Sequence, residues 1–112
     1  MPHCPDVGEI VWLTFDPQAG REQAGRRPAL VLSPKRYNQI ARLCILCPIT
    51  NTVRGWPLET SLKDSGASTT GVVLCDQVKS LSWFDRDCSL IEVCPPGIVL
   101  DVKAKIKALL AI

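Results

Sequence analysis

The apolar residues of this chain come in short runs that are closed by turn-forming residues. Examples are GEIVWLTF at 8–15, ALVLSP at 29–34 and LCILCPIT at 43–50. Runs of this length, rich in β-branched and aromatic residues and bounded by Pro, Gly or Asp, are typical of strands rather than helices. We therefore expect a mainly β protein built from many short strands.

The spacing of these runs predicts the order of the elements. We expect strands over 8–15, 27–33, 43–50, 57–62 and 89–93, one strand or a strand pair over 71–81, and a short helical turn over 36–41. Pro95 and Pro96 open a terminal helix, in which Val102, Ile106 and Leu109 recur at helical spacing. Many short strands followed by one helix indicate a small, strongly curved sheet or barrel closed by that helix.

Length and composition limit the class of protein. A chain of 112 residues, 46% of them apolar, suffices for a single domain over 1–112 with a modest core. The apolar runs are far shorter than the roughly 18 residues of a membrane helix. The N-terminal segment MPHCPDVGEI has no apolar signal-peptide region. We therefore expect a cytoplasmic protein that does not enter a membrane.

The six cysteines are expected to be reduced thiols, because nothing in the sequence directs the chain to an oxidising compartment. Cys44 and Cys47 have CxxC spacing, but positions i and i+3 of a strand face opposite sides of a sheet. They are therefore poorly placed to share a metal, and His3 is the only histidine. No metal site is predicted, and the exposure of Cys4 and Cys88 is left open.

Positive charge gathers in the first half of the chain. Residues 1–54 hold seven Lys and Arg against four acids, and the remainder holds six against seven. The net charge of +2 is too small to indicate nucleic-acid binding by itself. Two adjacent arginines, Arg26 and Arg27, stand where a long polar loop over 16–26 meets an apolar strand. Long loops in compact domains are often functional, so these arginines are candidate site residues.

The stretch FDPQAGREQAGRRPALVLSP at 15–34 resembles the first hairpin of the MazF-family toxins, also called PemK-like toxins. Later segments are similar to that family's later strands and terminal helix, in the same order: PIT at 48–50, GWP at 55–57, GVVLCDQVKSLSW at 71–83 and KAKIKALL at 103–110. The resemblance implies a small SH3-like or plasmid-toxin-like β-barrel with a C-terminal α-helix, assembled as a homodimer.

The resemblance also implies an activity and its partners. Toxins of this type belong to type II toxin–antitoxin pairs and act as metal-independent, sequence-specific endoribonucleases on single-stranded RNA, that is, as mRNA interferases. No cofactor is implied. The expected protein partner is a cognate antitoxin whose acidic, disordered tail covers the RNA groove, which suits a cationic groove on the toxin.

Site residues follow from the same resemblance. Arg27 holds the position of the catalytic arginine, Thr50 is its partner, and Glu22 is a general base or a reader of a base edge. Pro28 biases Arg27 toward extended backbone at the mouth of its strand. The RNA-binding residues implied are Asp16, Pro17, Gln23, Gly25, Arg26, Pro28 and Gln77.

The residue types agree with that chemistry. The RNA 2′-OH can attack the adjacent phosphorus to give 2′,3′-cyclic phosphate and 5′-OH ends, and the protein must stabilise the crowded anionic intermediate. A single histidine leaves no acid–base pair of histidines. Asp16, Glu22 and Asp76 are separated in sequence, so nothing marks a metal-binding carboxylate cluster. The Arg27 guanidinium carries a planar fork of donors that suits phosphate oxygens, and electrostatic stabilisation is its expected role.

Two other hypotheses stay open. A toxin of the same fold could instead bind a protein such as DNA gyrase, but such toxins lack the Arg and Thr pair and end in Trp-Gly-Ile, whereas this chain ends ALLAI. An inactive relative could bind only RNA or an antitoxin.

The remaining aromatic and basic residues have simpler interpretations. Trp12 and Trp83 are expected in the core or in a dimer interface. Trp56 lies in a polar turn, where packing is favoured over stacking on a base. Lys103, Lys105 and Lys107 are expected on the solvated face of the last helix.

Overall fold

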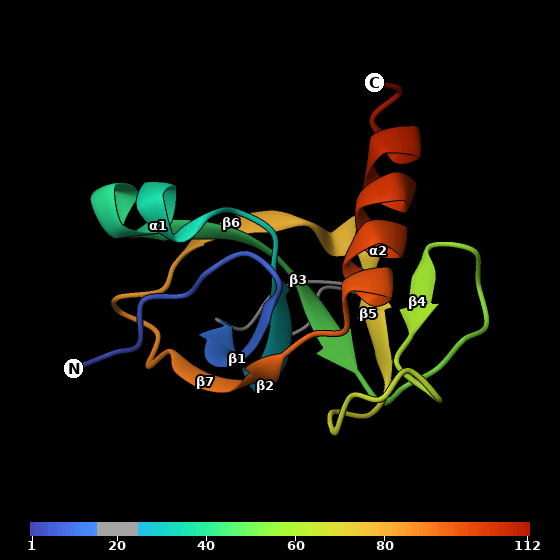
Figure 1. Ribbon diagram of the computed structural model, residues 1–112, viewed down its shortest axis with the longest axis horizontal. Helices are drawn as coiled ribbons and strands as arrows, with labels where there is room; N and C mark the ends of the chain where they lie inside the picture. The colour runs from blue at the N-terminus through green and yellow to red at the C-terminus, as the bar shows by residue number, and fades with distance from the viewer. Residues whose placement is uncertain (16–24) are drawn as a thin grey trace.

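The computed structural model describes residues 1–15 and 25–112 of the chain (Figure 1). Its strands are β1 Glu9–Phe15, β2 Gly25–Val31, β3 Leu43–Thr50, β4 Glu59–Ser61, β5 Val72–Leu74, β6 Lys79–Ser82 and β7 Ser89–Val93. Its helices are α1 Lys35–Ala41, the 3₁₀ turn η1 Cys75–Gln77 and the C-terminal α2 Pro96–Leu109. The mainly β class with a terminal helix, predicted from the sequence, is confirmed.

The strands form one seven-stranded sheet in the order β4-β5-β3-β2-β1-β7, with β6 paired to β3 outside this path. Every pairing among the described strands is antiparallel. One edge of β3 pairs with β6 up to Leu46 and with β5 from Ile49 onward. Pro48 falls between these two pairings, at a point where its missing N–H disturbs neither ladder.

The predicted strand over 71–81 divides into two. β5 and β6 both run antiparallel to β3, and η1 interrupts them so that each can follow a different half of that strand. Gln77 was expected on a strand and lies instead at the end of η1. The second strand begins at Gly25 rather than at Arg27, because Gly25 and Arg26 still pair with the end of β1.

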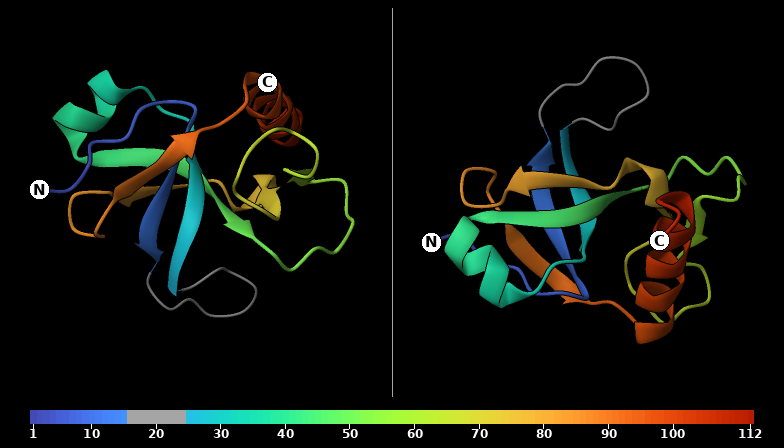
Figure 2. Two further views of the ribbon diagram at one scale, coloured as in Figure 1. Left: turned by 60° about the horizontal axis from the view of Figure 1, so that its bottom comes forward. Right: turned by 90° about the horizontal axis from the view of Figure 1, so that it is seen from above.

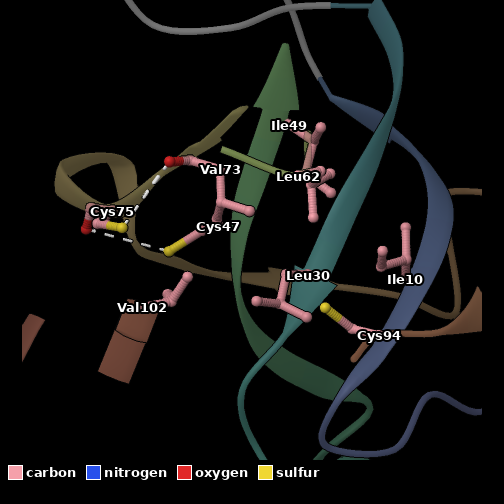
Figure 3. Packing of buried hydrophobic residues seen from close by; sticks show 9 residues of the cluster. All are labelled: Ile10, Leu30, Cys47, Ile49, Leu62, Val73, Cys75, Cys94 and Val102. Atoms are coloured by element: carbon pink, nitrogen blue, oxygen red, sulfur yellow. Dashed lines mark hydrogen bonds between the residues drawn. The ribbon is translucent and has the colours of Figure 1, made fainter. Parts of the chain in front are cut away.

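The central strands carry a hydrophobic core on each face. Successive residues of β2 belong to different clusters: Leu30 packs with Cys47 and Ile49, while Val31 packs on the other face with Leu46. Figure 3 shows the first of these clusters, which Val102 of α2 covers. Because both faces are buried, these strands consist of nearly continuous apolar residues instead of alternating apolar and polar ones.

The CxxC pair follows the same rule. Cys44 lies in one cluster and Cys47 in the other, so the two thiols are on opposite faces of β3, as the strand periodicity predicted. Cys88, whose exposure the sequence left open, is buried, and Cys4 is half-buried.

The terminal helix α2 packs beside β4, on the side of the molecule away from the N-terminus (Figure 2).

The prediction for Lys105 was wrong, because its ammonium is not on the solvated face. It donates to the backbone oxygen of Glu59 at 2.8 Å and to Thr60 Oγ1 at 3.0 Å, and it pairs with Asp101 at 2.9 Å. None of the helices that the structure describes is long and apolar enough to cross a membrane.

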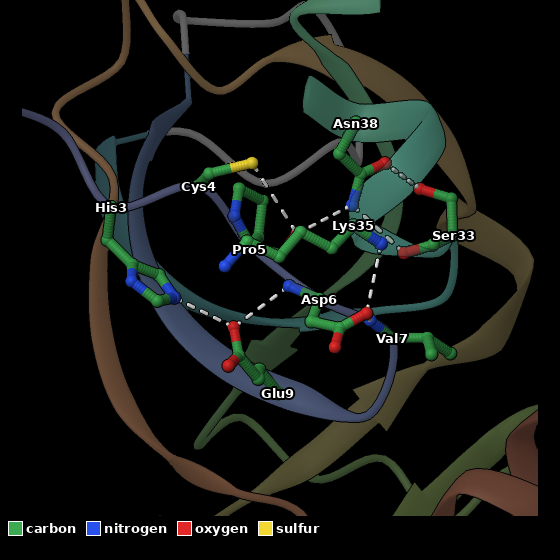
Figure 4. Close-up of polar contacts among 9 residues, drawn as sticks. All are labelled: His3, Cys4, Pro5, Asp6, Val7, Glu9, Ser33, Lys35 and Asn38. Carbon is green, nitrogen blue, oxygen red and sulfur yellow. Dashed lines mark hydrogen bonds and ion pairs between the residues drawn. The ribbon is translucent and has the colours of Figure 1, made fainter. Parts of the chain in front are cut away.

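At the other end of the molecule, a buried asparagine joins α1 to the N-terminal segment (Figure 4). Asn38 is fully buried. Its Nδ2 donates to the backbone oxygens of Pro5 and Ser33, both at 2.9 Å, and its Oδ1 accepts from Ser33 Oγ at 2.6 Å. Its backbone oxygen accepts from Trp83 Nε1 at 2.8 Å. This one residue therefore connects four segments of the chain.

Replacing Asn38 by alanine should destabilise the fold by about 2–3 kcal/mol, because two buried carbonyl groups and a buried hydroxyl would lose their partner. Urea denaturation measures the change. The matched control on the same helix is Ile40→Ala, where the side chain is 83% exposed and a shift within about 0.5 kcal/mol is expected. Equal losses in the two variants would contradict this role of Asn38.

Candidate functional site

Arg27 and Thr50 come from two neighbouring strands and meet at one end of the sheet. In the β2–β3 ladder Ala29 stands opposite Pro48. The same register, continued by two residues, places Arg27 opposite Thr50. Both residues line a single cleft. The structure thus brings together two residues that lie far apart in the sequence and that the resemblance had paired.

The cleft has a volume of about 470 Å³. Residues of β1, β2 and β3 line it, together with Ile91 of β7 and the segment 68–70. Arginine side chains stand beside hydroxyl groups and apolar surface in this space. The residues that matter for the argument below are Trp12, Arg26, Arg27, Thr50, Asn51 and Thr69.

Thr50 is held closely in place. It is 5% exposed, and its Oγ1 accepts a hydrogen bond from the backbone N–H of Thr52 at 3.1 Å. A hydroxyl that accepts one bond in this way keeps its own proton to donate. Behind it, Gly71 has φ +104°, and a Cβ at this position would lie 2.3 Å from the backbone oxygen of Thr50. Only glycine permits so close an approach.

The Arg26 side chain is hydrogen-bonded to other residues of the protein. Its guanidinium donates to the backbone oxygen of Asp87 at 2.7 Å and to Ser89 Oγ at 3.1 Å, while the residue also lines the cleft. These bonds hold the start of β2 to the start of β7. Arg27, one residue further on, is half-buried, and the following Pro28 stands opposite Trp12 in the β1–β2 ladder.

Trp12 is a cleft residue that the sequence interpretation missed. The core position expected for it is wrong, because Trp12 is 41% exposed and lines the cleft beside Arg27. The alternative, a place in a dimer interface, stays a prediction. The alternation of side chains between the two faces of β1 could have indicated the exposed position of Trp12. Val11, Leu13 and Phe15 are buried together on one face, so Trp12 projects from the other. Of the other two tryptophans, Trp83 is buried as expected.

A second, smaller cavity of about 240 Å³ lies on the other side of Thr50, which lines both. Gln77 and Trp56 contribute to it. Trp56 is 48% exposed, so the packing expected for it is not found. Buried Glu59 shapes this cavity, because its carboxylate accepts from the backbone N–H groups of Gly55 at 2.9 Å and Arg54 at 3.2 Å.

Four predicted site residues lie outside the described residues: Asp16, Pro17, Glu22 and Gln23. Gly25 is exposed at the first position of β2, with φ +78° and opposite Phe15. The predicted site residues that the structure places at the two cavities are therefore Arg26, Arg27, Pro28, Thr50 and Gln77.

Within residues 1–15 and 25–112, no group of three or more His, Cys, Asp or Glu side chains is arranged to hold a metal ion. The thiols are poor nucleophiles, because burial raises the pKa of Cys44 to about 12 and that of Cys94 to about 11. The polar groups with which residues 1–15 and 25–112 line the cleft are guanidinium, hydroxyl, amide and indole.

Gly71→Ala should displace Thr50 and destabilise the protein. The matched control is Gly66→Ala, where φ is +96° but a Cβ would meet nothing within 4 Å. Both variants carry the strain of a positive φ, of the order of 1–3 kcal/mol, so the additional loss in Gly71→Ala measures the crowding against Thr50. Thermal unfolding of the two variants is the measurement. Equal melting temperatures would show that the backbone accommodates the extra methyl group.

Residues 6–110 match the family described as PemK-like, MazF-like toxin of type II toxin–antitoxin system. The endoribonuclease toxin MazF of Escherichia coli (strain K12) is 43% identical over 108 residues, which cover 96% of both chains. The endoribonuclease PemK of Escherichia coli is 36% identical over 106 residues, covering 92% of this chain and 80% of PemK.

Solved structures agree with this match. A crystal structure of MazF from Deinococcus radiodurans superposes with a TM-score of 0.92 at 43% identity, covering 98% of this chain and 99% of that one. A MazE–MazF crystal structure from the same organism has a TM-score of 0.87 at 43% identity and covers 98% of each chain.

Proposed function

The chain belongs to the PemK-like, MazF-like toxin family, and from this premise we propose that it is the endoribonuclease toxin of a type II toxin–antitoxin pair. The proposed substrate is single-stranded RNA, cut at specific sequences by the single domain over 1–112, in the cytoplasm. The observation that carries the proposal is the cleft in which Arg27 and Thr50 meet, in a chain whose named relatives are endoribonucleases.

The proposed reaction uses a nucleophile that the RNA itself supplies. The 2′-OH attacks the adjacent phosphorus, the bond to the 5′ oxygen breaks, and the products are a 2′,3′-cyclic phosphate and a 5′-OH. Arg27 stabilises the charge that develops on the phosphoryl oxygens, and the Thr50 hydroxyl donates to one of them. Glu22 is the proposed general base or base reader. These steps use side chains of this chain and need no metal ion.

The two cavities beside Thr50 suggest how the strand lies. Single-stranded RNA is read through unstacked bases that stack on aromatic rings and bond to polar side chains. Trp12 offers an exposed ring in the first cavity, and Gln77 offers an amide in the second. Asp16, Pro17, Gln23, Gly25, Arg26 and Pro28 complete the proposed RNA-binding set.

The proposed partners are an antitoxin and a second copy of the chain. The MazE–MazF structures of Deinococcus radiodurans hold a toxin of this fold together with a second protein. We extend such pairing to this chain, with an antitoxin whose acidic, disordered tail occupies the cationic cleft in place of RNA. A homodimer of the toxin is part of the same proposal.

Arg27→Ala and Thr50→Val should each lower cleavage of a mixed-sequence single-stranded RNA by about 10²–10³-fold, because each removes a donor from the developing oxyanion. The assay is run in EDTA, and the cut ends are mapped for cyclic phosphate and 5′-OH. Arg36→Ala, an exposed arginine on α1, is the matched control and should cleave like wild type. Cleavage that is unchanged in both site variants, or abolished by EDTA, would refute the proposed mechanism.

Trp12→Ala should raise KM by roughly 5- to 100-fold while kcat changes little, because a base that stacks in both ground and transition states contributes uniform binding. Trp12→Phe keeps an aromatic ring and should restore most of the affinity. Steady-state cleavage of a short RNA that contains the mapped site gives both constants. A loss confined to kcat would instead assign Trp12 to the geometry of the reacting groups.

A further inference from the structure

We propose that Glu92 positions the cleft wall formed by residues 68–70 and, through this wall, the Thr50 hydroxyl. The inference rests on the proposed function, because it concerns how the same cleft is kept in shape for RNA cleavage. Glu92 is not among the cleft-lining residues, and it is assigned here as a positioning residue that acts through others.

The carboxylate of Glu92 is bonded to the segment that forms this wall. Its Oε1 accepts from the backbone N–H of Ser68 at 3.0 Å. Its Oε2 accepts from the backbone N–H of Thr69 at 2.7 Å and from the Thr69 hydroxyl at 2.6 Å. Hydrogen bonds to an ionised acceptor are stronger than those between neutral groups. The bond from the Thr69 hydroxyl and those from the two N–H groups also lower the pKa of Glu92, so the carboxylate is charged at neutral pH.

The same segment reaches Thr50 at its other end. Thr70 Oγ1 donates to Asn51 Oδ1 at 2.8 Å. Gly71 then packs against the backbone oxygen of Thr50, and Val72 pairs with Thr50 as β5 begins. Residues 68–71 therefore connect Glu92 to Thr50 and Asn51 through consecutive residues of the chain.

Glu92 lies on β7, the last strand in the order of the sheet. This strand pairs with β1, where Ile10 stands opposite Glu92 and Trp12 stands opposite Ser89. Ser89 also accepts a bond from Arg26. One strand thus holds the arginine side of the cleft through Ser89 and the threonine side through Glu92. A site held by a strand keeps its geometry better than one held only by loops.

Loss of the Glu92 carboxylate should act on the chemical step. Glu92→Ala is expected to lower kcat by about 10- to 100-fold with a smaller change in KM, since a displacement of about 1 Å in reacting groups has an effect of this size. Glu92→Gln keeps the shape and one acceptor oxygen, so it should recover part of the activity. Val93→Ala changes the neighbouring side chain, which is 72% exposed, and should leave kcat and KM unchanged.

A double-mutant cycle with Thr50→Val tests whether Glu92 acts through Thr50. All variants are assayed on the mapped RNA at a temperature where unfolding curves show them folded. If Glu92 positions Thr50, Glu92→Ala added to Thr50→Val should cost less than about 3-fold, because the hydroxyl it positions is already gone. Full multiplication of the two losses, or kcat like wild type in Glu92→Ala, would overturn the inference.

A measurement that needs no RNA tests the inference even if the Glu92→Ala variant is unstable. Amide hydrogen exchange of Ser68 or Thr69 should be faster in Glu92→Gln than in wild type, because only one acceptor oxygen remains for the two N–H groups, while exchange in β3 stays unchanged. Unchanged exchange at both Ser68 and Thr69 would overturn the inference. Failure of the proposed function is recognised separately, since Arg27→Ala and Thr50→Val would then cleave RNA as wild type does, whatever Glu92 does.

Discussion

The antiparallel pairing of β3 with three other strands is the constraint on which the rest of the structure depends. Its pairing with β2 sets the register that brings Arg27 opposite Thr50. On its other edge β3 pairs first with β6 and then with β5. The second of these pairings draws the segment before β5 against Thr50, where Gly71 alone allows the contact. β3 therefore determines both the pairing of its three neighbouring strands and the position of Thr50 in the cleft.

Two of the described carboxylates near the cavities, those of Glu92 and Glu59, accept hydrogen bonds from the backbone. Glu92 accepts from the N–H groups of residues 68 and 69, and Glu59 accepts from those of residues 54 and 55. Hydrogen bonds from nearby N–H groups offset part of the negative charge of both carboxylates. This lowers the repulsion that they would exert on an RNA phosphate. Among the described residues that line the cleft, the charged ones are Arg26 and Arg27 at the start of β2, which suits the proposed ribonuclease function.

Much of the fold could be predicted from the sequence. The bounds of β3 and β7 and the type of the terminal helix follow from short apolar runs and their turn residues, because local patterns decide secondary structure when burial is strong. The pairing of Arg27 with Thr50 came from the resemblance to a family, and the structure places both in one cleft. The roles of Trp12, Lys105 and the two carboxylates were missed. For Lys105 and the carboxylates, the partners lie 4 to 46 residues away in the chain.

By itself the sequence determined the bounds of β3 and β7, the terminal helix, and that a cation stands at the start of β2. These properties are local, and a few neighbouring residues suffice to decide them. Only the tertiary structure decided that Trp12 faces the cleft, that Lys105 turns inward to Glu59 and Thr60, and that Glu92 holds the wall beside Thr50. The physical reason is that a side chain's partner is set by strand register and by the packing of distant segments, which no local pattern contains.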